Sequence, residues 1–196
     1  MMHFRFITHL DTFAVIAKLF SLKPATWKGE PARGEPDICR SRSLLLRHHN
    51  KPTTDNWLQD LPLHDSAELQ AWVSLNRLLL QARKAIFTDA GTRAVLDPSA
   101  PPGRVMLSAV SKQNAVMWHT DSGPYHDRHI RFHIPLVTNP LCFLQVQNEQ
   151  VHMEVGSLWW FNNKFQHTAT NWGQHLRVHL IFEMPILSKK SDSDEA

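Results

Sequence analysis

From Arg104 onward the sequence alternates between apolar and polar residues, and this change of pattern constrains the fold more than any other feature. Neighbouring side chains of a β-strand point to opposite faces, so this alternation predicts half-buried strands. The segments that show it are 104–108, 115–119, 130–137, 141–147, 158–161 and 176–182, separated by short turns rich in Gly, Pro or Asn. Many short strands in succession predict a double-sheet jelly roll.

The first hundred residues show helical spacing instead. A short strand is predicted over 2–7 and a buried strand over 42–47. A helix is predicted over 11–20, with a shared apolar face made of Phe13, Ile16, Ala17 and Phe20. A longer helix is predicted from Asp65, which would cap it together with Glu68 three residues later. Its apolar positions are Leu69, Trp72, Val73, Leu79, Leu80 and Ile86.

These patterns together predict a fold that is mainly β with supporting helices. We expect one domain over residues 1–187, in which 1–100 form an N-terminal supporting region and 104–184 form a cupin-like jelly-roll core. Loops are expected over 23–36 and 50–63, where Pro, Gly and polar residues interrupt regular structure. The polar segment 188–196 is expected to be a disordered tail.

Composition narrows the classes of partner. The formal charge is +3, but Lys and Arg are spread along the chain, so we expect no nucleic-acid partner. Two cysteines without a Cys-x-x-Cys pair argue against a disulfide framework or a thiolate zinc site. No segment reaches the roughly 18 apolar residues of a membrane span, and no signal-peptide cleavage pattern follows the N-terminus. We therefore expect no membrane partner and a cytoplasmic location; the sequence gives no indication of oligomeric state.

His119 and Asp121 are the first candidates for chemistry. They are two residues apart at the end of a predicted strand, so their side chains share a face. His167 follows after an aromatic strand, and two imidazoles with one carboxylate suit iron(II), leaving positions free for oxygen and an organic co-substrate. Zinc accepts the same donors, and His167 alone also fits a surface loop over 162–171. The residues by themselves leave the metal open.

Arg177 lies in an alternating strand whose Val178 and Leu180 point one way while Arg177 and His179 point the other. If that second face lines a barrel interior, an unpaired arginine there would cost free energy. A carboxylate ligand would offset this cost by accepting two parallel hydrogen bonds from the guanidinium. A structural salt bridge to an acid such as Glu183, or plain solvent exposure, are the alternatives. Arg131 and His133 share a face in the same way.

Taken together, these residues resemble the aspartyl/asparaginyl β-hydroxylase family of iron(II)- and 2-oxoglutarate-dependent oxygenases. The resemblance covers about residues 104–184 and is specific because the motifs occur in order at matching separations. The matching residues are His119-Thr120-Asp121, Arg131-Phe132-His133-Ile134-Pro135-Leu136, Gly156, Trp160, His167, Asn171 and Arg177.

The resemblance implies a double-stranded β-helix with iron on His119, Asp121 and His167. It implies that Arg177, helped by Ser108, binds the far carboxylate of 2-oxoglutarate. Arg131 and His133 would hold the near carboxylate beside the metal. The implied reaction uses O2 and 2-oxoglutarate, releases succinate and carbon dioxide, and hydroxylates a C–H bond. The chain keeps an acid at Asp121, which favours hydroxylation over halogenation.

The substrate is less well defined by the sequence. The leading hypothesis is an amino acid, either free or within a peptide or protein, and Tyr125 and Asn163 are the residues that we expect to approach it. His152, His175 and His179 are given a structural or surface interpretation. The alternatives are a non-catalytic metal-binding jelly roll, for which the two arginines would be superfluous, and a hydroxylase of a lipid acyl chain.

Overall fold

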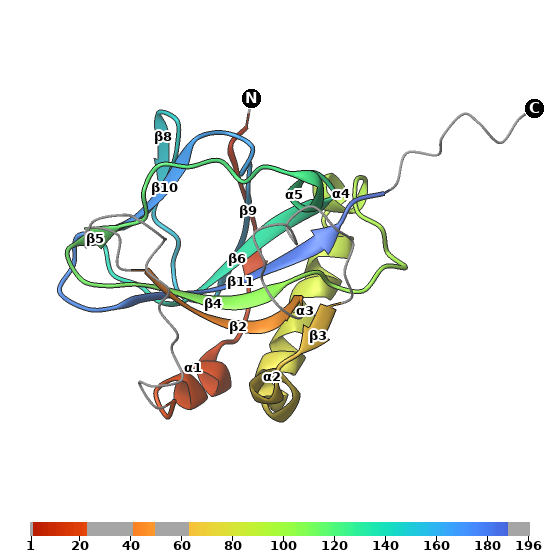
Figure 1. Ribbon diagram of the computed structural model, residues 1–196, viewed down its shortest axis with the longest axis horizontal. Helices are drawn as coiled ribbons and strands as arrows, with labels where there is room; N and C mark the ends of the chain where they lie inside the picture. Colours follow the sequence, from red (N-terminus) through yellow and green to blue (C-terminus); the bar gives the residue numbers. More distant parts are fainter. Residues whose placement is uncertain (1, 23–40, 50–62, 188–196) are drawn as a thin grey trace, which may run out of the picture.

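The computed structural model describes residues 2–22, 41–49 and 63–187, and these residues form two antiparallel sheets with helices against one of them (Figure 1). The larger sheet has seven strands in the order β1-β9-β6-β11-β4-β2-β3, and the smaller has four in the order β5-β10-β7-β8. The strands of the larger sheet are β1 (Phe4–His9), β2 (Ser41–His49), β3 (Leu63–Asp65), β4 (Val105–Val110), β6 (His129–Val137), β9 (Ser157–Phe161) and β11 (Arg177–Pro185). Those of the smaller sheet are β5 (Asn114–Ala115), β7 (Cys142–Val146), β8 (Glu149–Val151) and β10 (His167–Asn171). The helices are α1 (Phe13–Leu19), α2 (Ala67–Ala71), α3 (Val73–Thr88), α4 (Ala90–Arg93) and α5 (Pro124–Asp127). The prediction of a mainly β jelly roll with supporting helices is confirmed.

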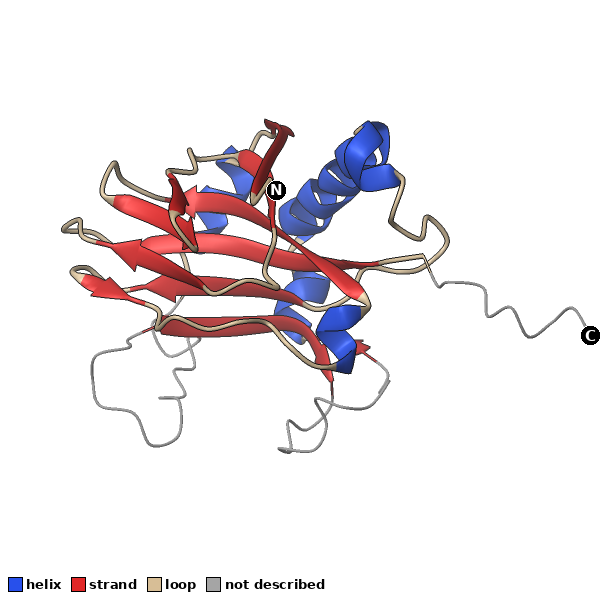
Figure 2. Cartoon of the chain, turned by 90° about the horizontal axis from the view of Figure 1, so that it is seen from above, coloured by secondary structure: helices blue, strands red, loops and turns tan. Residues whose placement is uncertain are grey.

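The larger sheet is the middle layer of the molecule, and its two faces have different neighbours (Figures 1 and 2). Val178 and Leu180 of β11 belong to the main hydrophobic core, together with Leu75 and Leu78 of α3. The alternate residues of β11 point to the opposite face, toward the smaller sheet. The period of two therefore separates an apolar, helix-covered face from a face that carries polar and charged side chains into the barrel.

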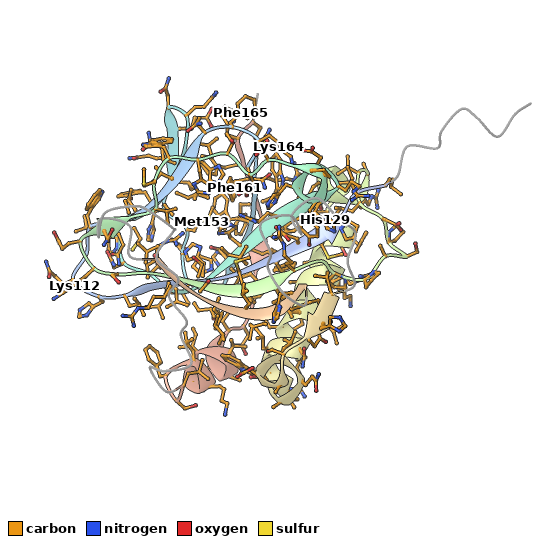
Figure 3. The ribbon with its side chains drawn as sticks, viewed as in Figure 1. Lys112, His129, Met153, Phe161, Lys164 and Phe165 are labelled. Carbon is orange, nitrogen blue, oxygen red and sulfur yellow. The ribbon has the colours of Figure 1, made fainter. Side chains whose placement is uncertain are left out.

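A second, smaller apolar cluster lies between the two sheets. Its buried members are Leu144, Val146, Met153 and Phe161, and Figure 3 shows Met153 and Phe161 in the space between the sheets. The ring of Phe161 contacts those of His133 and His167, with centroids 5.0 Å apart in each case. The barrel interior is thus part apolar wall and part polar site.

Most of the predicted strands are present, but the prediction that His167 lies in a loop over 162–171 is wrong. Residues 167–171 form β10, which pairs with β7 and with β5. The sequence of β10 hides its alternation because both faces are polar: His167 and Asn171 are buried inside the barrel, whereas Thr168 and Thr170 line a groove on the outside. The short strand β8 was also not predicted.

The N-terminal helices are positioned differently from the prediction. In α1 the buried residues are Val15 and Leu19, whereas Phe13 and Phe20 are 80% and 73% exposed, so the predicted apolar face was wrong. The longer helix is split into α2 and α3 at Trp72, and its N-cap is Ser66, whose hydroxyl accepts a hydrogen bond from the Leu69 amide. Asp65, predicted as the cap, instead forms an ion pair with Arg47.

Two of the buried-face assignments for the longer helix were also wrong, since Val73 and Leu80 are each 69% exposed. None of the helices in the described part of the chain has the length and apolar character needed to span a membrane. The predicted loop over 23–36, the predicted loop over 50–63 except its last residue, and the predicted tail over 188–196 lie outside the described residues. Leu63 is the first residue of β3.

Hydrogen bonds of the Asn171 side chain link the end of β10 to adjacent segments of the same polypeptide. This side chain is fully buried, donates hydrogen bonds to the carbonyls of Val110, Ser111 and His175, and accepts one from Asn139.

We predict that Asn171→Ala lowers the free energy of unfolding by about 2–3 kcal/mol, because buried carbonyls lose their donors. Denaturant unfolding measures this, with the exposed Gln174→Ala as control; equal stability of the two variants would contradict it.

Candidate metal centre

His119, Asp121 and His167 converge at one end of the barrel. One ligand atom from each of the three lies within 4.8 Å of the others, and His119 Nε2 is 3.8 Å from Asp121 Oδ1. Backbone hydrogen bonds bring the histidines together, since each amide donates to the carbonyl of the other, over 3.1 and 2.8 Å. The spacing suits three donors around a single ion.

Both imidazoles are oriented by a backbone carbonyl. Nδ1 of His119 lies 2.8 Å from the Met117 carbonyl, and Nδ1 of His167 lies 2.9 Å from that of Phe165. A carbonyl oxygen only accepts, so the proton sits on Nδ1 and each Nε2 keeps a lone pair, as in most metal-binding histidines. Burial lowers the pKa of His167, which favours the neutral, ligating form.

Two side chains hold Asp121 through a single oxygen. Its Oδ2 lies 2.6 Å from Arg131 Nη1 and accepts a hydrogen bond from Asn163 Nδ2 at 2.8 Å. The Asp121 amide in turn donates to the Asn163 carbonyl. Burial alone would raise the pKa of Asp121, but Arg131 and Asn163 outweigh it, so the pKa lies below its ordinary value and the carboxylate is ionised at neutral pH. The arrangement leaves Oδ1 on the side of the histidines.

Behind Arg131 lies a buried network of charges centred on Glu183. The Glu183 carboxylate bridges Arg131, at 2.8 Å, and Arg104, at 3.0 Å, and is 1% exposed. Burial would raise the pKa of Glu183, but the two guanidinium groups lower it to about 2. The alternative in which Glu183 pairs with Arg177 is therefore excluded, because the carboxylate is already shared by two other arginines.

Arg177 has a different environment. It is 2% exposed, and its Nη2 lies 3.1 Å from Nδ1 of His179; no carboxylate of the described residues pairs with it. Burial lowers the pKa of Arg177 to about 10, and the guanidinium remains charged at neutral pH. A buried, charged donor of this kind fits a carboxylate ligand, and a 2-oxoacid near it would also meet His133, whose buried Nε2 has no partner in the described part of the chain.

The other predicted residues are distributed as follows. Ser108 lies directly opposite His179 in the β4–β11 register, so the two side chains share the barrel face. Tyr125, predicted to approach substrate, is buried; its hydroxyl accepts a hydrogen bond from the Arg104 amide, and its ring stacks on His129. Asn163, the other predicted substrate residue, donates a hydrogen bond to Asp121, and the contact of both residues with substrate stays a prediction. His179, for which a structural or surface interpretation was expected, lies beside Arg177.

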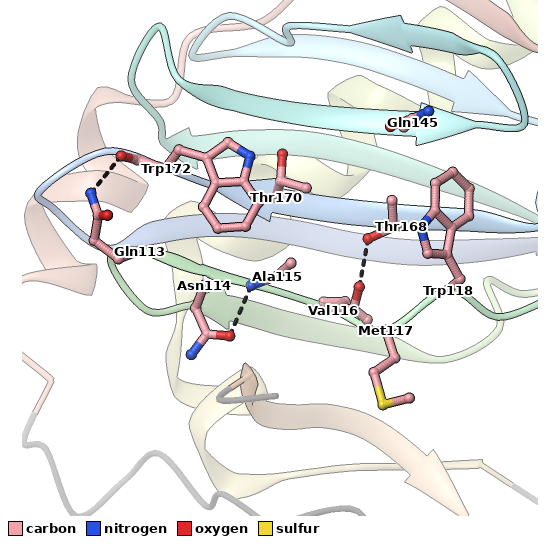
Figure 4. Close-up of a pocket in the computed structure, with 10 residues that line it drawn as sticks. All are labelled: Gln113, Asn114, Ala115, Val116, Met117, Trp118, Gln145, Thr168, Thr170 and Trp172. Carbon is pink, nitrogen blue, oxygen red and sulfur yellow. Dashed lines mark hydrogen bonds between the residues drawn. The ribbon is translucent and has the colours of Figure 1, made fainter. Parts of the chain in front are cut away.

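A groove of about 640 Å³ on the outer face of β10 is separate from this centre (Figure 4). Thr168 and Thr170 line it, and the indole rings of Trp118 and Trp172 stand on either side of them. Because side chains alternate along β10, the ligand His167 points to the opposite face. The groove is therefore not the cavity that faces the metal ligands.

Comparison with known proteins identifies the class of protein to which this fold and site belong. Residues 49–185 match the family described as aspartyl/asparaginyl beta-hydroxylase, and the chain belongs to that family. It is accordingly a 2-oxoglutarate- and iron(II)-dependent oxygenase. No curated protein matched the chain.

Solved structures share the fold. A Burkholderia pseudomallei oxidoreductase of the 2OG-Fe(II) oxygenase family superimposes with a TM-score of 0.59 at 13% identity, covering 87% of this chain and 77% of that one. A Pseudomonas putida prolyl-4-hydroxylase gives 0.55 at 15% identity, covering 95% of each chain. A Trichoplax adhaerens prolyl hydroxylase, solved with a hypoxia inducible factor peptide, gives 0.55 at 12% identity, covering 93% and 83%.

The contact between Asn163 and Asp121 leads to a prediction for metal affinity. Asn163→Ala removes one of the two groups that orient the carboxylate, so we expect Mn²⁺ to bind roughly 10-fold more weakly in calorimetry, as is usual for groups that support a ligand. The neighbouring Asn162→Ala is the matched control, because the Asn162 side chain accepts a hydrogen bond from the Lys164 amide and forms none with Asp121 in the described part of the chain. Unchanged affinity in Asn163→Ala would contradict the prediction.

The depressed pKa of Glu183 predicts a stability that depends on pH. A carboxylate whose pKa is lower in the folded than in the unfolded state stabilises the fold. For Glu183 this contribution is complete above the unfolded-state pKa of 4.5 and is lost as the pH falls toward the folded-state pKa of about 2. We expect the free energy of unfolding to fall across this window in the wild type. Glu183→Gln should be less stable at pH 7 by ~3 kcal/mol, because two buried arginines lose their partner, and should show a shallower slope. Parallel slopes in the two proteins would count against this assignment.

Proposed function

We propose that the protein hydroxylates an amino-acid side chain, either free or within a peptide or protein. The observation that carries the proposal is the pairing of two features in one barrel: a His-Asp-His cluster at one end and a buried arginine without a carboxylate partner among the described residues. A bare metal-binding site would not require that arginine. The family's description supports aspartyl or asparaginyl groups as the first substrates to test.

In this proposal His119, Asp121 and His167 hold iron(II) through Nε2, Oδ1 and Nε2. The bound iron, with 2-oxoglutarate and O2, supplies the oxidative decarboxylation to succinate and carbon dioxide that is coupled to hydroxylation of a C–H bond. The part of the protein is to fix the donors. Arg131 and Asn163 occupy Oδ2, so Asp121 offers one oxygen and leaves other positions of the ion open.

The arginine and the polar groups around it would bind 2-oxoglutarate. Arg177, with Ser108 on the neighbouring strand, would take the far carboxylate. His133, whose buried Nε2 has no hydrogen-bond partner among the described residues, would help to hold the near one. Arg131 already contacts Asp121 and Glu183, so its proposed contact with the near carboxylate would be added to these two. One guanidinium would then orient both a metal ligand and the co-substrate.

The apolar wall of the barrel would keep water from the reacting groups. Phe161 lies between His133 and His167, and Met153 and Val146 pack beside it. Excluding water strengthens the electrostatic interactions of the buried groups and limits side reactions. The same wall leaves the exposed edge of His119 as the side from which a substrate would approach.

The test is succinate formation from 2-oxoglutarate in the presence of iron(II). We expect peptides and free amino acids of the aspartyl and asparaginyl class to stimulate it, and His119→Ala to abolish the stimulated rate, because one of three ligands is lost. His64→Ala, an exposed histidine on β3, should keep the wild-type rate.

Full activity in His119→Ala would refute the assignment of the metal site. Stimulation by acyl-chain substrates, without stimulation by any amino acid or peptide, would instead replace the proposed substrate class.

A further inference from the structure

The partner of Arg177 is an imidazole and not an acid. His179 is 2% exposed, lies two residues further along β11 on the same face, and places Nδ1 3.1 Å from Arg177 Nη2. A guanidinium can only donate, so His179 Nδ1 accepts and the imidazole is neutral with its proton on Nε2. Burial, with Arg177 nearby, keeps the pKa of His179 well below its usual value, in agreement with this assignment.

A neutral acceptor fixes a guanidinium without cancelling its charge. At Glu183 the opposite arrangement is found, because two arginines surround one carboxylate and the charges compensate. At Arg177 no carboxylate of the described residues neutralises the positive charge, so the guanidinium can still attract an anionic ligand. Ser108 lies opposite His179 in the register, and His133 Nδ1 lies 3.3 Å from His179 Nδ1, so the groups proposed to bind 2-oxoglutarate surround this imidazole.

We propose that His179 is a positioning residue for 2-oxoglutarate, holding the Arg177 guanidinium toward the far carboxylate while leaving its charge uncompensated. This inference rests on the proposed function. It assigns a role to a residue that contacts neither the metal ligands nor any acid in the hydrogen bonds and ion pairs of the described residues.

Substitutions at residue 179 separate orientation from charge. His179→Leu keeps the volume but removes the acceptor, so we expect 2-oxoglutarate to bind the Mn²⁺-loaded protein about 10-fold more weakly. His179→Asn should restore most of the affinity, because its amide oxygen can occupy the place of Nδ1. His179→Glu should weaken binding most, because a buried carboxylate would pair with Arg177 in place of the ligand.

Two further measurements distinguish positioning from a general structural role. Pyruvate, a 2-oxoacid that lacks the far carboxylate, should bind His179→Leu as it binds the wild type. The dissociation constant of 2-oxoglutarate divided by that of pyruvate should therefore be about 10-fold higher in His179→Leu than in the wild type. The affinity for Mn²⁺ should be unchanged in every variant. His175→Leu, an exposed histidine two residues before Arg177, is the matched control and should behave as wild type in both measurements.

The outcomes are distinct. A wild-type protein that binds no 2-oxoglutarate would refute the proposed function itself. A wild type that binds it, with His179→Leu equally tight, or with 2-oxoglutarate and pyruvate weakened alike, would overturn the role of His179 and leave the function standing. If His179→Leu does not fold, the Asn and Glu variants decide: equal affinity in the two overturns the inference, and a much weaker Glu variant supports it.

Discussion

The pair of backbone hydrogen bonds between His119 and His167 is the constraint on which the candidate site depends. These bonds join the segment that follows β5 to the start of β10, so main-chain pairing brings together two imidazoles that are far apart in sequence. The carbonyls of Met117 and Phe165 then set which ring nitrogen remains free. Ligand position and ligand tautomer are thus both consequences of main-chain geometry, which the sheet fixes and side-chain substitution disturbs little.

Charge in the barrel interior is divided into two regions with different balances. Near the ligands, Asp121 and Glu183 are matched by Arg131 and Arg104, so the buried ions compensate one another and stabilise the site by mutual pairing. Around Arg177 no such compensation exists among the described residues, where its polar partner, the imidazole of His179, is neutral. In the proposed function, the first region supports a metal ligand and the second binds the anionic co-substrate. Arginine would then serve structure in one place and recognition in the other.

The sequence predicted the parts of the fold in which apolar and polar residues alternate. It located β4, β6, β7, β9 and β11, and it placed Arg177 and His179 on one face. It missed β10 because His167 and Asn171 face the inside while Thr168 and Thr170 face the outside, so polar residues occur on both faces and little hydrophobic period remains. The prediction of which face of α1 is buried was wrong, because Phe13 and Phe20 are exposed although they are large and apolar. Which face is buried depends on packing partners that are distant in the sequence. The contacts of Asn163 and Tyr125 could not be predicted either, because their partners are distant in the sequence. Asn163 lies 42 residues from Asp121, and Tyr125 lies 21 residues from Arg104.

The central position of β11 determines what a substitution along this strand would change. Between residues 177 and 184 the even-numbered side chains belong to the helix-covered core and three of the four odd-numbered ones belong to the polar network inside the barrel. A substitution at an even position therefore acts on the volume of the core, whereas one at position 177, 179 or 183 acts on charge and hydrogen bonding inside the barrel. Packing and site chemistry are thus controlled by adjacent residues of a single strand.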